Sequence, residues 1–341
     1  MKALVKKEPK LGIWLEDVPM PEVGLTDVLI KVTQAAICGT DLHMYKWDEW
    51  SQTHCQPPYI MGHEFVGVVA QVGNGVKNFK VGERVTAEGH IACGHCRNCR
   101  RGMAHVCEHT LSVGITRNGA FAEYVSIPES NVVKINPKIS DDFASIMDPF
   151  GNATHTALSF PLLGEDVLIT GAGLIGTMAT GICRYAGAKN IVVTDLNDLR
   201  LDIAKKMGAT LTVNARKGET IADAMAQLGI HGFDVGLEMS GSPIAFNDMV
   251  AHMYKGANIA QLGILPAETH VNWSDIIFNA LTIKGITGRK MWETWYQMEQ
   301  MLLGGLDLSP VITHHFAFED FQKGFDVMTE GNCGKVILKI S

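Results

Sequence analysis

A glycine-rich turn in the middle of the chain most constrains its fold. Gly171-Ala172-Gly173-Leu174-Ile175-Gly176 follows an apolar strand candidate at 166–170 and opens an uncharged stretch that reaches Cys183. This is G-x-G-x-x-G between a buried strand and a helix, where the glycines let a pyrophosphate approach the backbone. The sequence therefore predicts a dinucleotide site at Gly171, Gly173, Ile175 and Gly176. The alternative is a glycine-rich turn without a ligand.

The next strand candidate, at 190–195, ends in the acid that this pattern requires. Asp195 follows the glycines by about 20 residues, the usual spacing of the ribose-binding carboxylate. A carboxylate accepts hydrogen bonds from the ribose hydroxyls and repels a 2′-phosphate, so NAD is favoured over NADP. Arg200 leaves an alternative open, because it could serve a 2′-phosphate or pack along the adenine ribose.

Four further strand candidates, at 211–214, 233–238, 257–262 and 281–286, alternate with helical stretches. Six strands joined by crossovers make a doubly wound domain, in which ligands bind beyond the carboxyl ends of the strands. We therefore expect backbone near the cofactor at two strand ends, formed by Leu262, Gly263, Ile264, Ile286 and Thr287. The alternative is ordinary turns at these strand ends.

Four cysteines in a short window predict a structural metal. They have the spacing C-x2-C-x2-C-x7-C and are Cys93, Cys96, Cys99 and Cys107. Four thiolates suit tetrahedral zinc. The ferredoxin cluster run is C-x2-C-x2-C-x3-C-P, whereas here the last gap is longer and Glu108 follows. Cysteines that are buried or paired in disulfides are the remaining alternative.

Composition excludes several classes of protein. The formal net charge is −7, which argues against a nucleic-acid binder despite Arg97, Arg100 and Arg101 beside the cysteines. The longest uncharged run, 167–183, is shorter than the ~20 residues of a membrane helix. The first residues lack the apolar segment of a signal peptide. We expect a cytoplasmic enzyme with a small-molecule substrate and no nucleic-acid or membrane partner.

The first 140 residues are expected to be mainly strands, because no helix-period pattern of useful length appears before Ala144. Cys38, His63 and Glu64 lie here and are the ligand types of a catalytic zinc. They are distant in sequence, so only the fold can bring them together. The segment 47–50 combines tryptophans with acids and is interpreted as a packed loop, or alternatively as a lid over a substrate pocket.

Together these motifs resemble those of the zinc-dependent medium-chain alcohol dehydrogenases. The resemblance covers essentially the whole chain and rests on Gly62-His63-Glu64-x-x-Gly67-x5-Gly73, the four cysteines and the glycine fingerprint. It implies a mixed α/β fold, with a GroES-like β-rich catalytic domain and a Rossmann domain. The expected division is a catalytic domain at 1–145 with the cysteine lobe, an NAD-binding domain at 146–288, and a return to the catalytic domain at 289–341.

The resemblance also implies the chemistry. It assigns a catalytic zinc to Cys38 and His63, with Glu64 as a ligand or a close neighbour. Together with the structural zinc, this gives two zinc ions per subunit. Thr40 and His43 match the family's proton relay. Asp148 stands where many members have a cysteine, so it is either a ligand or part of the relay. Typical members of the subgroup are homotetramers.

The segments 36–43, 47–51 and 148–153 are most similar to the members that oxidise L-threonine at C3 with NAD. The product implied is L-2-amino-3-oxobutanoate. A polyol or butanediol dehydrogenase of the same family is one alternative, since it shares every zinc and NAD feature. A non-catalytic NAD-binding scaffold is another, although it would be expected to lose Cys38, His63 and Glu64.

Overall fold

A computed structural model describes residues 1–340, which divide into two compact units. Unit 1 comprises Met1–Asp148 together with the chain from Ile312 onward, and unit 2 is Pro149–Val311. The first boundary lies close to the expected one at 145/146. The return to unit 1 lies at Ile312 rather than at residue 289, because helix α11 (Glu293–Leu303) belongs to unit 2 and buries Trp295, Met298 and Met301.

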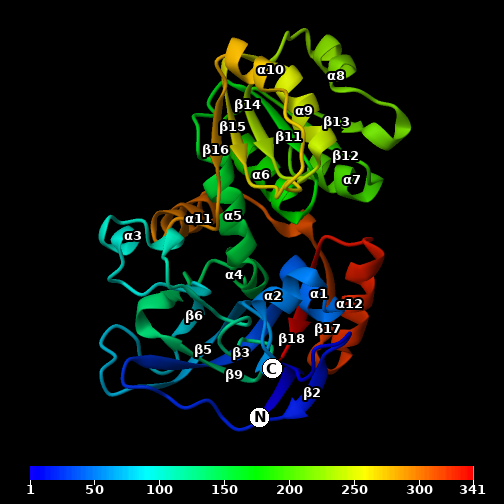
Figure 1. The fold of residues 1–341 in the computed structure, drawn as a ribbon. Coiled ribbons are helices and arrows are strands. Elements are labelled where there is room, and N and C mark those ends of the chain that lie inside the picture. The colour runs from blue at the N-terminus through cyan, green and yellow to red at the C-terminus, as the bar shows by residue number, and fades with distance from the viewer. Residues whose placement is uncertain (341) are drawn as a thin grey trace. The chain divides into compact units, whose positions relative to one another are not determined.

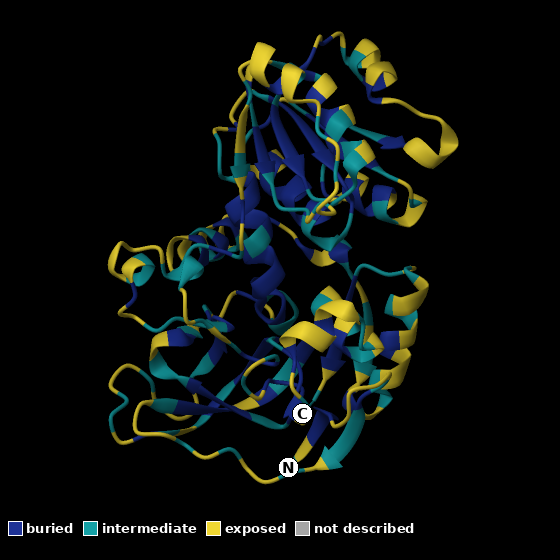
Figure 2. Cartoon of the chain, in the orientation of Figure 1, coloured by how far each residue is buried: buried dark blue, intermediate teal, exposed yellow. Residues whose placement is uncertain are grey.

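Unit 2 is the doubly wound domain expected from the glycine pattern. Its six parallel strands have the order β13-β12-β11-β14-β15-β16 (Figure 1). They are β11 (Asp166–Thr170), β12 (Asn190–Asp195), β13 (Leu211–Asn214), β14 (Phe233–Glu238), β15 (Met253–Gln261) and β16 (Thr282–Gly285). The order reverses at β11, and crossovers that run to both sides of such a point place helices on both faces of the sheet. The inner strands are buried (Figure 2).

The helices of unit 2 follow the strands in alternation. They are α6 (Leu174–Tyr185), α7 (Asp198–Lys206), α8 (Ile221–Leu228), α9 (Pro243–Ala251), α10 (Trp273–Phe278) and α11, while α5 (Met147–Ala157) leads into the unit. Helix α6 begins directly after the glycine turn, and most of its residues are buried. None of the helices in residues 1–340 combines the length and the hydropathy needed to span a bilayer.

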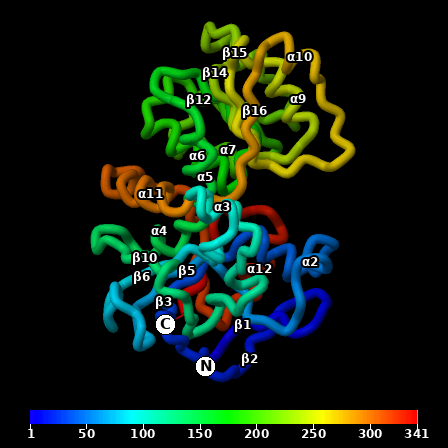
Figure 3. The backbone as a smooth tube through the Cα atoms, turned by 60° about the vertical axis from the view of Figure 1, so that its left-hand side comes forward, coloured from blue at the N-terminus to red at the C-terminus, as the bar shows by residue number. Residues whose placement is uncertain are grey.

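Unit 1 is built on a seven-stranded sheet with the order β10-β6-β5-β3-β18-β17, in which β9 also pairs with β3. The strands are β3 (Asp27–Ile37), β5 (Glu64–Val72), β6 (Arg84–Ala87), β9 (Tyr124–Pro128), β10 (Val132–Lys134), β17 (Ile312–Ala317) and β18 (Lys335–Lys339). Strand β18 follows all of unit 2 in sequence, yet it pairs with β3 on one side and β17 on the other. In Figure 3 the C-terminal end of the chain accordingly lies among the blue and cyan segments of unit 1.

Smaller elements complete unit 1. A three-stranded sheet contains β1 (Lys2–Lys6), β2 (Trp14–Asp17) and β4 (Tyr59–Ile60), and a two-stranded sheet contains β7 (His90–Ile91) and β8 (Leu111–Ser112). The helices are α1 (Gly39–Lys46), α2 (Glu49–His54), α3 (Arg97–Arg100), α4 (Asp141–Ser145) and α12 (Phe321–Glu330).

The part of unit 1 before Ala144 was expected to be mainly strands, but it also contains short helices that no pattern of useful length predicted. Helices α1, α2 and α3 all precede it, and the segment interpreted as a packed loop forms the start of α2. These helices are short and begin at polar caps rather than repeating an apolar face. The Cys38 amide donates to Asp41 Oδ2 at 2.8 Å at the start of α1, and Asp48 Oδ1 accepts from the Ser51 amide at 3.1 Å at the start of α2.

Candidate active site and metal centres

The four cysteines of the lobe in unit 1 come together. The sulfur atoms of Cys93, Cys96, Cys99 and Cys107 all lie within 4.8 Å of one another. The Sγ atoms of Cys96 and Cys99 are 3.5 Å apart, and those of Cys96 and Cys107 are 3.9 Å apart. A zinc tetrahedron with bonds of about 2.3 Å separates its sulfurs by about 3.8 Å. The spacing of the sulfurs therefore fits a zinc ion.

Backbone amides around the lobe favour thiolates. The amides of Cys93 and His109 each donate to the Cys107 sulfur at 3.3 Å. Although desolvation acts in the opposite direction, these bonds lower the pKa of Cys107 to about 6. Desolvation and the neighbouring thiols raise the pKa of Cys99 to about 12. Four thiolates this close need a cation between them, which is the chemistry of a closed zinc site.

A second candidate metal centre forms where two strands of the unit 1 sheet pair. The antiparallel register places Ala36 of β3 opposite Glu64, the first residue of β5. Cys38 follows β3 by one residue, and His63 immediately precedes β5. One ligand atom from each of Cys38, His63 and Glu64 therefore lies within 4.8 Å of the other two. The sheet register unites residues that sequence alone could only suggest.

The atoms of this second centre fit a bound cation. His63 Nδ1 and Glu64 Oε1 are buried without a hydrogen-bond partner in the described structure. Burial alone would lower the pKa of His63, but the charges of Asp41 and Cys38 raise it well above its ordinary value. The pKa of Glu64 is raised by burial. A thiol, an imidazole and a carboxylate with orphaned acceptor atoms form a donor set that zinc would satisfy.

Two buried charged residues that the sequence reasoning missed support this centre. Asp41 is fully buried, and its Oδ1 lies 3.7 Å from His63 Nδ1, which is beyond hydrogen-bond distance but close enough for its charge to raise the pKa of His63. Lys335 of β18 is also buried, and its Nζ donates to Glu64 Oε2 at 2.6 Å and to the Ile37 carbonyl at 2.9 Å. Lys335 lies 271 positions from Glu64, so no local pattern could have indicated it.

The predicted relay residues lie in the same unit. Thr40 and His43 are three positions apart on α1, so they share one face of the helix. The His43 side chain is 58% exposed, while Asp148 at the start of α5 is buried. Asp148 is not in the three-residue ligand group, but its charge raises the pKa values of His63 and Glu64. It is therefore a near neighbour of that group.

The glycines of the fingerprint occupy the turn between β11 and α6 in unit 2. Gly171 has a left-handed φ of 92°, and Gly173 caps α6. A Cβ on Gly176 would lie 1.9 Å from the Gly171 carbonyl oxygen, so only glycine fits there. Ile175 is the second residue of α6 and is partly exposed. The turn leaves backbone amides at a helix N-terminus, the arrangement that binds a pyrophosphate.

Asp195 lies beside this turn at the end of β12. Its Oδ2 accepts from the Ala172 amide at 2.7 Å, and its Oδ1 accepts from the Leu196 and Asn197 amides at 2.7 and 2.9 Å. The carboxylate is thus fixed at the carboxyl edge of the sheet, where a ribose is expected. Arg200 lies in the first turn of α7, the helix that follows.

The other predicted cofactor residues follow β15 and β16. The amides of Leu262 and Gly263 donate to the Glu238 carbonyl at 2.9 and 3.0 Å, and the Ile286 amide donates to the Gln261 carbonyl at 2.9 Å. Ile264 is 92% exposed, and Thr287 is exposed beside buried Ile286. All five residues therefore lie at the carboxyl ends of parallel strands in unit 2.

Glu238 organises this edge of the sheet and was missed by the sequence reasoning. The carboxylate is fully buried and accepts from the amides of Ser240 and Gly241 at 2.9 and 3.0 Å and from Gln261 Nε2 at 2.6 Å. A Cβ on Gly263 would lie 2.2 Å from Glu238 Oε2. Glu238 therefore fixes the loops after β14 and β15 against each other.

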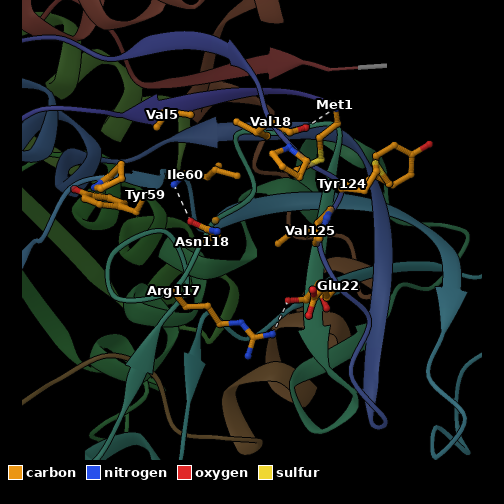
Figure 4. A pocket seen from close by; sticks show the side chains of 16 residues that line it. Met1, Val5, Val18, Glu22, Tyr59, Ile60, Arg117, Asn118, Tyr124 and Val125 are labelled. Carbon is orange, nitrogen blue, oxygen red and sulfur yellow. Dashed lines mark hydrogen bonds between the residues drawn. The ribbon is translucent and has the colours of Figure 1, made fainter.

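Unit 1 also contains a cavity of about 550 Å³, and none of the residues that line it belongs to either candidate metal centre (Figure 4). Its polar groups already bind the protein's own backbone. The Met1 amine donates to the Val18 carbonyl at 2.8 Å, Asn118 Oδ1 accepts from the Ile60 amide at 3.0 Å, and Arg117 Nη2 donates to the Ser126 carbonyl at 3.0 Å. None of the predicted site residues lines it.

Comparisons with known proteins agree with this architecture. The family described as "Alcohol dehydrogenase GroES-like domain" matches residues 24–137, and "Zinc-binding dehydrogenase" matches residues 175–304. A curated L-threonine 3-dehydrogenase from Alteromonas mediterranea is 59% identical over 339 residues, which cover 99% of each chain. The expected fold class, a GroES-like domain plus a doubly wound domain, is confirmed.

Two solved structures share the fold over nearly their full length. The 2R,3R-butanediol dehydrogenase from Bacillus subtilis is 26% identical with a TM-score of 0.90, covering 100% of this chain and 99% of that one. A structure from Escherichia coli CFT073, described as a short chain alcohol dehydrogenase complexed with NADH, is 27% identical with a TM-score of 0.91 and the same coverage. The chain belongs to the zinc-dependent medium-chain alcohol dehydrogenase family.

Proposed function

We propose that the chain oxidises the C3 hydroxyl of L-threonine with NAD, giving L-2-amino-3-oxobutanoate, NADH and a proton. The observation that carries this proposal is the 59% identity, over 99% of both chains, to a curated L-threonine 3-dehydrogenase. The two donor sets in unit 1 and the glycine turn with Asp195 in unit 2 supply the groups that such a reaction needs.

Cys38, His63 and Glu64 would hold the catalytic zinc, and the four cysteines of the lobe would hold a structural one. Zinc held by Cys38, His63 and Glu64 would supply Lewis acidity, which makes a nearby hydroxyl easier to deprotonate at neutral pH. Three protein ligands leave one position open, as catalytic zinc sites require. The charge of Asp41 lies close to the His63 ring, and Lys335 balances the charge of Glu64.

Thr40 and His43 carry the proton away from the substrate hydroxyl. The Thr40 hydroxyl can both accept and donate a hydrogen bond, so it can take the proton and pass it on. His43 lies one helical turn further along α1 with a half-exposed side chain, which suits a group that releases the proton to solvent. Asp148 is assigned to this proton path, since Cys38, His63 and Glu64 already provide three ligands.

The glycine turn of unit 2 would bind the NAD pyrophosphate, and NAD supplies the hydride acceptor. Asp195 accepts hydrogen bonds from the ribose hydroxyls and repels a 2′-phosphate. Arg200, Ile175 and the residues after β15 and β16 are assigned to the rest of the cofactor surface. The feature that supports NAD over NADP is the fixed carboxylate of Asp195.

A substrate panel tests the proposed function. Purified, zinc-loaded protein is given L-threonine, D-threonine, 2,3-butanediol and sorbitol with NAD, and NADH is followed by absorbance. L-Threonine is expected to have a kcat/KM at least tenfold above the others. A higher value for 2,3-butanediol would favour the activity named for the Bacillus subtilis relative. No turnover of any alcohol, with NAD bound, would favour a scaffold.

A homotetramer is the assembly we propose. The support is an apolar area at the end of the unit 2 sheet, where β16 pairs with β15 on one side only. Near it Trp273, Ile277 and Phe278 of α10 are 63%, 68% and 80% exposed. A sheet edge beside exposed apolar side chains suits pairing with a second copy. The number of four copies rests on the family resemblance. Light scattering should give four times the chain mass of 37.1 kDa.

We also propose that the protein works in the cytoplasm. All eight cysteines are free of disulfides, and four of them form the thiolate cluster of the lobe. Metal-binding cysteines persist as thiolates in a reducing compartment. Expression with a fluorescent tag followed by fractionation tests this proposal, and recovery in an oxidising compartment would contradict it.

A further inference from the structure

His43 contacts a carboxylate that the proposed mechanism does not use. The His43 Nδ1 atom and Asp48 Oδ2 form a short hydrogen bond within unit 1. The side chains are 58% and 36% exposed, so the pair lies at the surface. The Trp50 ring lies 6.1 Å from the imidazole, tilted by 51°. The Nδ1 atom of His43 is therefore already hydrogen-bonded, and Nε2 is the ring nitrogen that can exchange a proton.

The start of helix α2 holds Asp48 in place. Its Oδ1 accepts from the Ser51 amide at 3.1 Å and from the Ser51 hydroxyl at 3.2 Å, and Ser51 is fully buried. Burial acts in the opposite direction, but the hydrogen bonds from His43 and Ser51 lower the pKa of Asp48. Asp48 is thus a carboxylate at neutral pH, with one oxygen for the helix and the other for His43.

The turn between α1 and α2 aims Asp48 back at His43. Trp47 ends α1 with a φ of 57°, a left-handed conformation that is uncommon for a bulky residue, and its amide donates to the His43 carbonyl at 2.9 Å. The Lys6 ammonium lies 5.1 Å from the centre of the Trp47 ring and donates to the Gly12 carbonyl at 2.9 Å. Buried contacts thus fix a turn that would otherwise relax.

We propose that Asp48 is a positioning residue that keeps the His43 proton on Nδ1 and the lone pair on Nε2. A carboxylate only accepts hydrogen bonds, so the neutral imidazole must donate from Nδ1 and accept at Nε2. This inference rests on the proposed function, in which His43 receives the proton released by the alcohol. Nε2 binds that proton, the ring becomes an imidazolium beside the carboxylate, and the proton then leaves to solvent.

Asp48→Asn separates this role from helix capping. Asparagine is as good a helix N-cap as aspartate, so its side-chain oxygen can keep the hydrogen bonds from Ser51. Its amide nitrogen then faces His43 Nδ1, which must accept, and the ring proton moves to Nε2. The probe is ¹⁵N NMR of histidine-labelled protein at a pH where the ring is neutral, with the His43 signals assigned through His43→Gln. We expect Nδ1–H in the unmutated protein and Nε2–H in Asp48→Asn. The same tautomer in both proteins would overturn the proposal.

Kinetics with L-threonine and NAD supply the second measurement. Asp48→Asn is expected to lower kcat by about tenfold or more, up to the roughly 10²–10⁴-fold loss typical of removing a general acid–base group. Both KM values should change by less than about twofold. In a His43→Ala background Asp48→Asn should have no further effect, because the residues act as a unit. The control is Glu49→Gln, which removes an exposed carboxylate from the same helix and should leave kcat unchanged.

The outcomes are distinct. If Asp48→Asn lowers kcat by the same factor with and without His43, then Asp48 acts through something else and the proposal is overturned. If the unmutated protein does not oxidise L-threonine, the proposed function fails, while the NMR comparison still decides the tautomer of His43.

Discussion

Replacing Lys335 with methionine should destabilise unit 1 far more than an ordinary surface change. Lys335 and Glu64 are both nearly inaccessible to solvent and meet at 2.6 Å. Removing one partner of a buried ion pair costs about 3–5 kcal/mol, because the other charge stays buried without compensation. The Ile37 carbonyl also loses its donor. At about 2–4 °C per kcal/mol, thermal unfolding should shift down by about 6–20 °C.

The matched control is Lys134→Met. Lys134 pairs with Glu83 at 2.8 Å, but these side chains are 54% and 31% exposed, so the loss should be at most about 1 kcal/mol. Both variants are compared by thermal and urea unfolding, in metal-free and in zinc-loaded protein. If Lys335→Met falls within about 1 kcal/mol of Lys134→Met in metal-free protein, the buried pair does not carry the stability that its geometry indicates.

The pH dependence gives a further check on this variant. Burial raises the pKa of Glu64 in the folded protein, and the charge of Lys335 limits that rise. Removing Lys335 raises the pKa of Glu64 further. When the pKa of a carboxyl group is higher in the folded state than in the unfolded state, the free energy of unfolding falls as the pH increases through that folded-state pKa. The destabilisation should therefore be smallest at acidic pH, below the ordinary carboxyl value, and grow toward neutral pH.

Three further predictions concern the metals and the cofactor. Elemental analysis of protein purified without chelator should give about two zinc ions per chain, and Cys99→Ser should lose about one of them; one zinc with full activity would remove one of the two sites. Asp195→Ala should narrow the preference for NAD, which we expect to exceed ~1 kcal/mol in kcat/KM; equal use of NADP by the unmutated protein would show that Arg200 governs the choice. Asp148→Ala should keep its zinc and lose about 10²–10⁴-fold in kcat; zinc lost and activity restored by added zinc would make Asp148 a ligand.

The first four strands of unit 2 could be predicted to the residue, although the unit ends at Val311 rather than at the expected residue 288. The strands at 166–170, 190–195, 211–214 and 233–238 have the expected bounds. Short apolar runs bounded by glycines and alternating with helices leave few other arrangements for a parallel sheet. The strands after them differ by a few residues, since β15 begins at Met253 rather than 257. Local pattern and topology agree here, so the sequence suffices.

Unit 1 was predicted less well for a physical reason. Helices α1 and α2 are short and are fixed by caps at Cys38 and Asp48, so the sequence contains no apolar periodicity that would predict them. The four-cysteine candidate site was evident because its spacing is visible in sequence, whereas Cys38, His63 and Glu64 could be named only as ligand types that the fold would have to unite. Their supporting charges, Asp41 and Lys335, were not, because a buried acid or base looks like a surface one until the fold is known.

The position of β18 has a consequence for biosynthesis. It lies one strand in from the edge of the unit 1 sheet, between β3 and the edge strand β17, and carries the lysine that pairs with Glu64. The ribosome therefore produces all of unit 2 before the strand that completes unit 1 exists. Cys38, His63 and Glu64 are made early, but until β18 emerges β3 has an open edge and the buried carboxylate has no lysine. A nascent chain that stalls within unit 2 exposes an incomplete sheet with an unpaired strand edge, which is prone to aggregation. Chaperones are therefore expected to matter most at this stage.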